Sequence, residues 1–320
     1  MLEKRWATPQ DKHDIIDFID FVFSKAHRPH DFATLLPKLY CDAADTTEHH
    51  FLIKEDGKIL AAILAYPVKM TIGEETFMTL GVGSVSTHPR ARGRGFMDDL
   101  LAAVDARAKE CGAVCAVLGG NRQRYGYYGF DLGGYQMTAN IQRHNAQHAF
   151  KDAAVTGLSL CPMTEEHVPF AAALHSAQPS YCHRSPETFL TILKNWCNTP
   201  MAICREGEMI GYCVVNPAAK PAFVAELLLK DEADCPAVLK LLSETYGTLN
   251  VLTAPWHAQR VALLASVCQG FSLTANHMMK FYEPERIVSA LNKLGFSGDS
   301  LNFTSLTLPL PFFVAPADGV

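Results

Sequence analysis

A turn rich in arginine and glycine carries the strongest chemical signal in this sequence. Residues 85–96 read VSTHPRARGRGF and join a strand-like stretch to a helix-like one. The first N–H groups of a helix are unpaired, and together with the helix dipole they attract anions. Gly93 and Gly95 allow the backbone to approach a ligand closely. Forked donors that suit phosphate oxygens come from three side chains, Arg90, Arg92 and Arg94. This composition predicts a pyrophosphate-binding turn.

Other phosphate-binding loops fit this stretch less well. The chain has no G-x-x-x-x-G-K-[ST] motif, which disfavours a P-loop nucleotidase. The dinucleotide-binding fingerprint needs a third glycine and a later acidic residue, and both are missing. A solvated arginine-rich turn with capping glycines remains the structural alternative.

The elements around the turn follow from hydrophobic patterning. Residues 10–25 have helical spacing, and residues 49–72 are expected to form a hairpin around Asp56-Gly57, a strong two-residue turn signal. Residues 74–87, which lead into the turn, are expected to form the next strand. A helix is expected over residues 93–110, with Gly112 at its C-terminus. The continuous apolar run AVCAVLG predicts a buried strand directly after this helix.

A partial repeat divides the chain into two related α/β units. IKEDGKILAAIL from Ile53 aligns with ICREGEMIGYCV from Ile203, so that Gly57 coincides with Gly207. We predict mixed central sheets with flanking helices in both units. The expected boundaries are 1–150 for the first unit, 151–285 for a degenerate second unit, and 286–320 for a C-terminal appendix.

The motifs of the first unit resemble those of the GCN5-related N-acetyltransferases (GNAT). Arg90-x-x-Gly93-x-Gly95 matches the R/Q-x-x-G-x-G/A signature, and NRQRYGYYGF resembles the Y-x-x-x-G-F element. The whole chain is similar to tandem acetyltransferases of the Eis type. Those proteins carry a third, sterol-carrier-like domain, for which the residues after 285 are too few.

The resemblance implies a set of site residues. The backbone of Val85, Ser86 and Thr87 would pair with the pantetheine arm of acetyl-CoA, and the turn that ends at Phe96 would hold its pyrophosphate. Asn121 would bond an amide of the cofactor. Tyr125 matches the general acid of the family, and a phenol with a pKa near 10 suits protonation of a departing thiolate. Tyr127 and Tyr128 are its competitors.

The general base stays open at this point. Water is one candidate, as it is in many members of the family. The other candidates are Glu48, His49, His50, Glu226, His257 and the carboxylate of Val320, and the acceptor site would be bordered by His27, Arg28, His30 and Asp31. In the second unit, Trp256, His257 and Tyr212 would line the acceptor pocket.

Loss of the anion turn makes the second unit degenerate. Asp231, Glu232 and Asp234 stand where the arginines would be, and these carboxylates would repel a pyrophosphate. One acetyl-CoA per chain is therefore expected.

Composition limits the remaining function classes. The net charge of −5 gives the whole surface no attraction for nucleic acid or anionic membrane. No export signal or spanning segment is recognised, and the ten scattered cysteines include no C-x-x-C pair. We expect a cytoplasmic protein without a metal, while a homo-oligomer stays open.

The leading hypothesis is an N-acetyltransferase that moves an acetyl group from acetyl-CoA to a primary amine by direct attack. The acceptor would be a small molecule or a peptidyl amine. A Fem-type aminoacyl transferase is a second hypothesis, although it needs a basic surface for tRNA. A sensor that binds acetyl-CoA without turnover is the non-enzymatic alternative.

Overall fold

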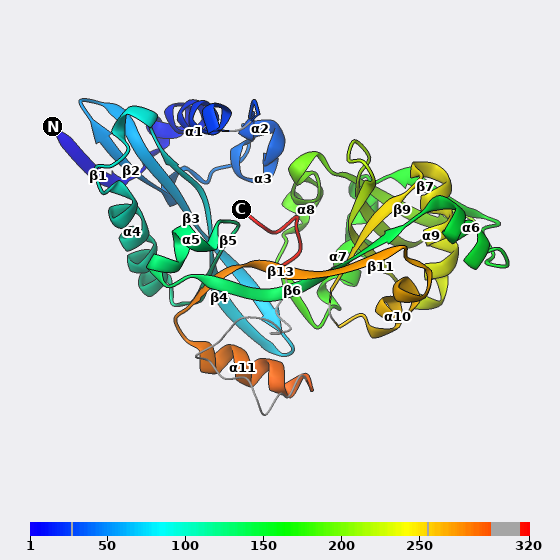
Figure 1. Cartoon of the computed structure of the whole chain (residues 1–320). Helices are drawn as coiled ribbons and strands as arrows, with labels where there is room; N and C mark the ends of the chain where they lie inside the picture. The colour runs from blue at the N-terminus through cyan, green and yellow to red at the C-terminus, as the bar shows by residue number, and fades with distance from the viewer. Residues whose placement is uncertain (27, 255, 296–313) are drawn as a thin grey trace. The chain divides into compact units, whose positions relative to one another are not determined.

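Two compact units make up the chain in the computed structural model, which describes residues 1–26, 28–254, 256–295 and 314–320. The first unit contains Met1–Leu132, the described residues that follow His277, and Gly319–Val320. The second contains Gly133–Asn276 and the described residues that end at Asp318. Each unit has a β-sheet with helices on both faces, which confirms the predicted α/β class (Figure 1).

These units are not contiguous in sequence, and their limits differ from the expected boundaries at residues 150 and 285. Strand β6 (Asp131–Ile141) leaves the first unit, and β13 (Gly270–Phe281) returns to it, where Met278–Phe281 pair with β5 (Ala113–Leu118). The expected appendix is also divided, because α11 (Pro284–Lys293) lies in the first unit while Asp318 lies in the second.

The first unit is built around an antiparallel meander that ends in one parallel pair of strands. The strand order is β1-β2-β3-β4-β5-β13, and only β4 and β5 run parallel in it. The elements are β1 (Leu2–Trp6), α1 (Lys12–Ala26), α2 (Phe32–Leu35), α3 (Pro37–Tyr40), β2 (His50–Glu55), β3 (Lys58–Ile72), β4 (Glu75–Thr87), α4 (Phe96–Cys111), β5 (Ala113–Leu118) and α5 (Arg122–Tyr125).

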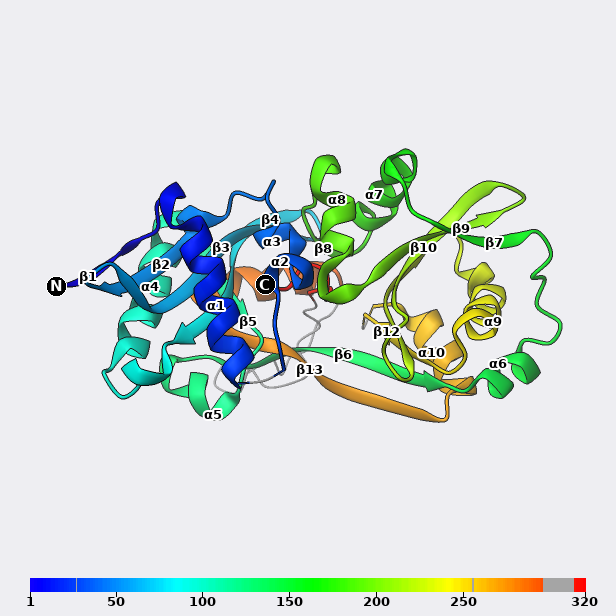
Figure 2. The ribbon, with the colours of Figure 1, turned by 90° about the horizontal axis from the view of Figure 1, so that it is seen from above.

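Alternation along β3 explains why a helix covers each face of this sheet. Ile63 packs in one cluster with Leu100 and Val104 of α4, whereas its neighbour Leu64 packs with Ile19 of α1. A strand buried on both faces reads as a continuous apolar run, as ILAAILA does. Figures 1 and 2 show α1 and α4 on opposite sides of these strands.

The second unit repeats this plan. Its strand order is β13-β6-β12-β11-β10-β9-β7, in which β11 and β12 form the parallel pair. The elements are α6 (Arg143–Ala149), β7 (Leu158–Pro162), α7 (Val168–Ser176), β8 (Ser180–Cys182), α8 (Pro186–Leu193), β9 (Thr199–Arg205), β10 (Glu208–Asn216), β11 (Ala222–Leu229), α9 (Cys235–Tyr246), β12 (Leu249–Thr253) and α10 (Ala258–Val267). Helices α7 and α8 pack on one face, and α9 and α10 pack on the other (Figure 2).

A helix that spans a bilayer needs about 20 consecutive, mostly apolar residues. Within the described ranges, every helix is too short or too polar to cross a membrane.

Candidate functional site

The site of the first unit begins where β4 separates from β5. Their parallel pairing ends at Val82 and Leu118, so within the described residues the last part of β4 is not paired with β5. Just beyond this point β4 bulges, because Leu64 pairs with Gly83 while Ala62 pairs with Ser86. Ser84 in the bulge has φ of 51°, a left-handed value that is uncommon outside glycine. Backbone groups after the bulge can therefore accept an extended ligand as an added strand.

The glycines of the turn have the conformation that their predicted role requires. Gly93 and Gly95 both have φ of 77°, and Gly95 is the N-cap of α4. A Cβ built on Gly93 would meet no atom within 4 Å, so a side chain would have room here. The requirement for glycine therefore comes from the positive φ of the backbone. The turn thus presents the N-terminus of a 16-residue helix to solvent.

A cavity of about 670 Å³ lies along this open edge. From β4, the turn and the first residues of α4, its lining includes Val85, Ser86, Thr87, Arg92 and Met97. The C-terminal part of α1 forms another wall, and Arg124 contributes from α5. The structure thus brings the predicted strand segment and one predicted arginine to the same cavity.

The three arginines of the turn are not equivalent. Arg94 donates to both carboxylate oxygens of Glu55 on β2, at 2.8 and 3.1 Å, and stacks on Phe96. Arg90 and Arg92 are exposed, and only Arg92 lines the cavity. Since the donors of Arg94 already face a carboxylate, Arg92 is the better placed ligand for an anion.

A matched pair of variants tests this ranking. Arg92→Ala is expected to weaken coenzyme A binding about tenfold or more, because a hydrogen bond to a charged group is worth roughly 1.5–3 kcal/mol. Arg94→Ala should change the Kd much less, since its guanidinium is bonded to Glu55. Isothermal titration with coenzyme A measures both constants, and equal losses would contradict the ranking.

The three candidate tyrosines lie in different surroundings. Tyr125 is buried, at 6% exposure, and burial raises the pKa of its phenol, partly opposed by the charge of Arg124. Tyr128 donates to Asp98 at 2.8 Å, and burial together with this carboxylate raises its pKa to about 12. Tyr127 is 90% exposed. Of the three, only Tyr125 is a protonated phenol held inside the unit without a carboxylate partner in the described structure.

Asn121 has a local structural role besides its predicted one. Its side-chain oxygen accepts the N–H of Gln123 at 2.8 Å and caps α5, the short helix that ends at Tyr125. The ring of Tyr125 lies against Gly120, where a Cβ would come within 2.5 Å of Cε2. The two residues therefore help to fix the position of Tyr125.

A buried hydrogen-bond chain starts at the bulge and was not anticipated from the sequence. The Nδ1 atom of His50 faces the carbonyl oxygens of Thr46 and Thr47 at 3.1 and 3.3 Å, so it carries the proton. The Nε2 atom then accepts from Tyr40, at 3.1 Å, and the Tyr40 oxygen in turn accepts from Ser84. This chain holds the strained bulge in place.

His50 is expected to make stability depend on pH. Burial lowers its pKa from 6.5 to about 4, opposed by the bonds to Thr47 and Thr46, so folded His50 is neutral where the unfolded residue takes up a proton. The free energy of unfolding should therefore fall by about 1.4 kcal/mol per pH unit from this group, as pH drops from 6.5 to 4.

Urea unfolding of a His50→Gln variant across this pH range measures the contribution. The slope of unfolding free energy against pH should be shallower than in the wild type, with His13→Gln as the control for loss of an exposed imidazole. Identical slopes in wild type and His50→Gln would contradict the assignment.

The remaining base candidates and the residues expected to border the acceptor site include exposed side chains and side chains with local structural contacts. Glu48 has a side chain that is 76% exposed, and it lies 3.8 Å from His49. Asp31 caps α2 by accepting from Thr34, and His30 contacts the carbonyl of Arg28. His27 lies outside the described residues.

Val320 lies against the bulged strand. A Cβ on Gly81 would come within 2.7 Å of its side chain, and a Cβ on Gly83 within 3.0 Å of its backbone carbon. The two glycines of β4 therefore make room for this residue next to Ser84.

The second unit differs from the first at the corresponding turn. Asp231 caps a short 3-10 helix before α9, Asp234 pairs with Arg205, and Glu232 pairs with Arg260. Three carboxylates thus replace the arginines and glycines of the first unit, which makes this turn unfavourable for a pyrophosphate.

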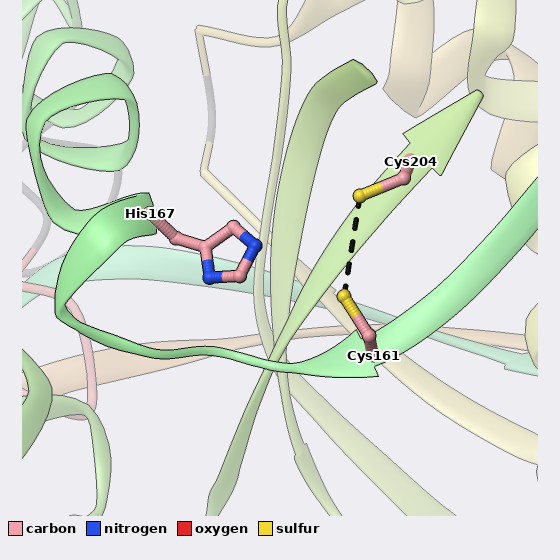
Figure 3. A group of neighbouring side chains, drawn as sticks. All are labelled: Cys161, His167 and Cys204. Carbon is pink, nitrogen blue, oxygen red and sulfur yellow. Dashed lines mark hydrogen bonds between the residues drawn. The ribbon is translucent and has the colours of Figure 1, made fainter. Parts of the chain in front are cut away.

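Two cysteines and a histidine that are distant in sequence meet in the second unit (Figure 3). The Sγ atoms of Cys161 and Cys204 are 4.0 Å apart, and His167 lies beside them. The Nδ1 atom of His167 accepts the backbone N–H of Thr164 at 3.0 Å, which leaves the proton of a neutral ring on Nε2. Coordination through Nε2 would require moving this proton to Nδ1 and breaking that bond, so we assign no metal to the cluster.

Comparison with known proteins identifies the domain that carries the cavity and the turn. Residues 3–133 match the family model of the acetyltransferase (GNAT) domain. The match lies in the first unit and covers 131 of the 320 residues, so the chain carries a segment similar to a GNAT domain. This segment supports the predicted acyltransferase class. None of the curated proteins matches the sequence.

Solved structures share the fold over most of the chain. A GCN5-related N-acetyltransferase from Kribbella flavida has a TM-score of 0.68 and 16% identity, and covers 91% of this chain and 74% of its own. Eis1 from Mycobacterium abscessus has a TM-score of 0.61 and 13% identity. The match covers 91% of this chain and 76% of the Eis1 chain. Saccharomyces cerevisiae N-myristoyltransferase with bound myristoyl-CoA has a TM-score of 0.53 and 12% identity. The match covers 88% of this chain and 79% of the yeast chain. The predicted resemblance to GNAT enzymes, Eis included, is confirmed at the level of fold.

Proposed function

We propose that the protein is an N-acetyltransferase that moves the acetyl group of acetyl-CoA to a primary amine. One observation carries the proposal: a cavity lies along the open edge of β4, and its lining includes Arg92, which directly precedes the turn glycines Gly93 and Gly95 with their left-handed conformations. The open edge of β4 suits an extended pantetheine arm, and the turn at the start of α4 suits a pyrophosphate. The yeast N-myristoyltransferase of similar fold binds an acyl-CoA, myristoyl-CoA, which supports this class of donor.

In the proposed reaction the neutral amine attacks the thioester carbonyl directly. A C–N bond forms, the oxyanion is stabilised by a backbone N–H near Ser86, and the C–S bond then breaks. The departing thiolate takes the proton of Tyr125, whose burial keeps the phenol protonated until then. The proton released by the amine passes to water and restores the phenol.

We assign the base role to water because the side-chain candidates have other partners or lie in the solvent. Glu226 is bonded to Arg184 and Tyr212 in the second unit, and Glu48 is exposed. Val320 lies against the bulged part of β4, next to the proposed oxyanion site.

The ten cysteines are free thiols, which fits the reducing cytoplasm that we propose as the location. The tandem arrangement supports an Eis-like enzyme with one acetyl-CoA per chain, because the second unit lacks the anion turn.

A panel of amines tested with acetyl-CoA examines the proposal. Acetyl transfer should release free coenzyme A thiol in proportion to acetylated amine, whether the acceptor is a small molecule or a peptide. Binding of acetyl-CoA without thiol release by any amine would favour the sensor. Transfer only from aminoacyl-tRNA would favour the Fem-type enzyme. Either result would overturn the proposal.

A further inference from the structure

We infer that the second unit has its own ligand site, which binds a small organic ammonium ion where β11 and β12 diverge. Parallel pairing covers only Ala222–Val224 and Leu249–Val251, and a bulge follows in the register of β10 and β11. Beyond the pairing, the two strands line a cavity of about 50 Å³. At roughly 10–15 Å³ for each water-sized group, this space holds an ammonium group with a short carbon chain.

Arg260 closes this cleft to an arm of the pantetheine type. Its guanidinium donates to the backbone carbonyl of Leu227 on the edge of β11, and also to both carboxylate oxygens of Glu232. At 2% exposure it is part of the interior. The backbone edge that would pair with such an arm is therefore occupied, and the cavity must serve a different ligand.

Charges around the cavity favour a cation. Arg184 is fully buried and lies between two carboxylates: it donates to Glu226 at 2.9 and 3.0 Å, and to Asp318 at 2.8 and 2.9 Å. The pair of Arg260 and Glu232 adds no net charge, so Arg184, Glu226 and Asp318 decide the balance. The balance is one negative charge in a buried place, which an anionic ligand would increase and a cation would neutralise.

The two histidines of the cavity do not supply the missing positive charge. Burial lowers the pKa of His175, and burial together with Arg260 lowers that of His257 to about 3. The Nε2 atom of neutral His175 donates to the carbonyl of Cys182 at 2.8 Å, so its Nδ1 lone pair faces a Glu226 oxygen 3.9 Å away. Two acceptor atoms therefore face each other.

Unpaired acceptors in the lining point to a ligand that donates hydrogen bonds. In the described part of the chain, Ser180 Oγ and Gln178 Oε1 are buried without a partner, and Ser180 is only 6% exposed. The Gln178 amide nitrogen already donates to Leu174, so its oxygen remains as an acceptor. A primary ammonium offers three donors, and Trp256 and Tyr181 offer aromatic faces for its charge.

Titration of ¹⁵N-labelled protein with ethylammonium chloride tests the inference by NMR, in phosphate buffer at constant ionic strength and without coenzyme A. The indole signal of Trp256, identified with Trp256→Phe, should shift and saturate with a Kd of about 1 mM, as expected for so few ligand atoms. Signals of Trp6 and Trp196, which do not line the cavity, should stay in place. Ethanol and sodium acetate should cause no saturable shift.

Two variants locate the site. Ser180→Val fills the cavity and removes the unpaired hydroxyl, and Glu226→Gln removes one charge, so each should weaken binding at least tenfold. Ser266→Val, an exposed change on α10, is the matched control and should bind as the wild type does. Melting curves check folding, and Ser180→Val keeps the test decisive if Glu226→Gln unfolds.

Absence of a saturable shift, equal binding of acetate, or unchanged binding in folded Ser180→Val would overturn the inference. A separate titration of the wild type with coenzyme A distinguishes it from the proposed function. If coenzyme A binds but ethylammonium causes no response, only this inference is refuted. If ethylammonium binds but coenzyme A does not, only the proposed function is refuted.

Discussion

A Gly93→Val, Gly95→Val double variant is expected to lose coenzyme A binding, with a Kd raised at least 100-fold. Both residues have φ of 77°, a region in which an L-residue costs roughly 1–2 kcal/mol and a β-branched one more. The turn would therefore adopt another conformation, and the N–H groups at the start of α4 would no longer converge on the pyrophosphate. The two added side chains would also cover the face that the ligand approaches. Isothermal titration with coenzyme A measures the loss.

Gly112→Val is the matched control for this experiment. Gly112 caps the other end of α4 with φ of 65° and, like Gly93, has no atom within 4 Å of a built Cβ. The substitution brings the same kind of backbone strain to the same helix, far from the turn. It should lower stability and leave the Kd for coenzyme A unchanged. Normal affinity in the double variant would refute the role of the turn.

Tyr125→Phe is expected to slow acetyl transfer by roughly ten- to a thousandfold and to leave coenzyme A affinity intact. The substitution removes only the hydroxyl, so the ring should still pack against Gly120 and Phe130. Without the phenol, the thiolate must take its proton from water. The rate of thiol release with an accepted amine gives kcat, and a titration gives the Kd.

Tyr127→Phe supplies the comparison, because Tyr127 lies two residues away and is 90% exposed. Its turnover should equal that of the wild type. If Tyr125→Phe also turns over at the wild-type rate with a confirmed acceptor, the acid lies elsewhere, and Tyr128, bonded to Asp98, becomes the next phenol to examine.

Local patterns were sufficient to predict the strand, turn and helix that border the proposed cofactor site. The hairpin at Asp56-Gly57, the glycine-rich turn and the C-cap at Gly112 depend on residue types that are adjacent in sequence. For the same reason, the adjacent residues Asp231, Glu232 and Asp234 were sufficient to predict that the second unit lacks the anion turn.

Features that depend on distant residues could not be predicted in this way. Arg94 is removed from the set of available donors by Glu55, 39 positions earlier in the chain. The bulge at Ser84 is held by Tyr40 and His50, whose types alone suggest core packing. The partial repeat likewise says nothing of β13, which pairs with β5 across more than 150 residues. Single-sequence patterns carry no signal for such pairings.

A crystal structure of the protein with bound coenzyme A tests the central claim most directly. We predict that the pyrophosphate lies against the backbone amides between Arg92 and Phe96, and that the pantetheine arm extends along Val85–Thr87 on the open edge of β4. A pyrophosphate found at any other place on the chain, or an arm that avoids this edge, would contradict the assignment of the site.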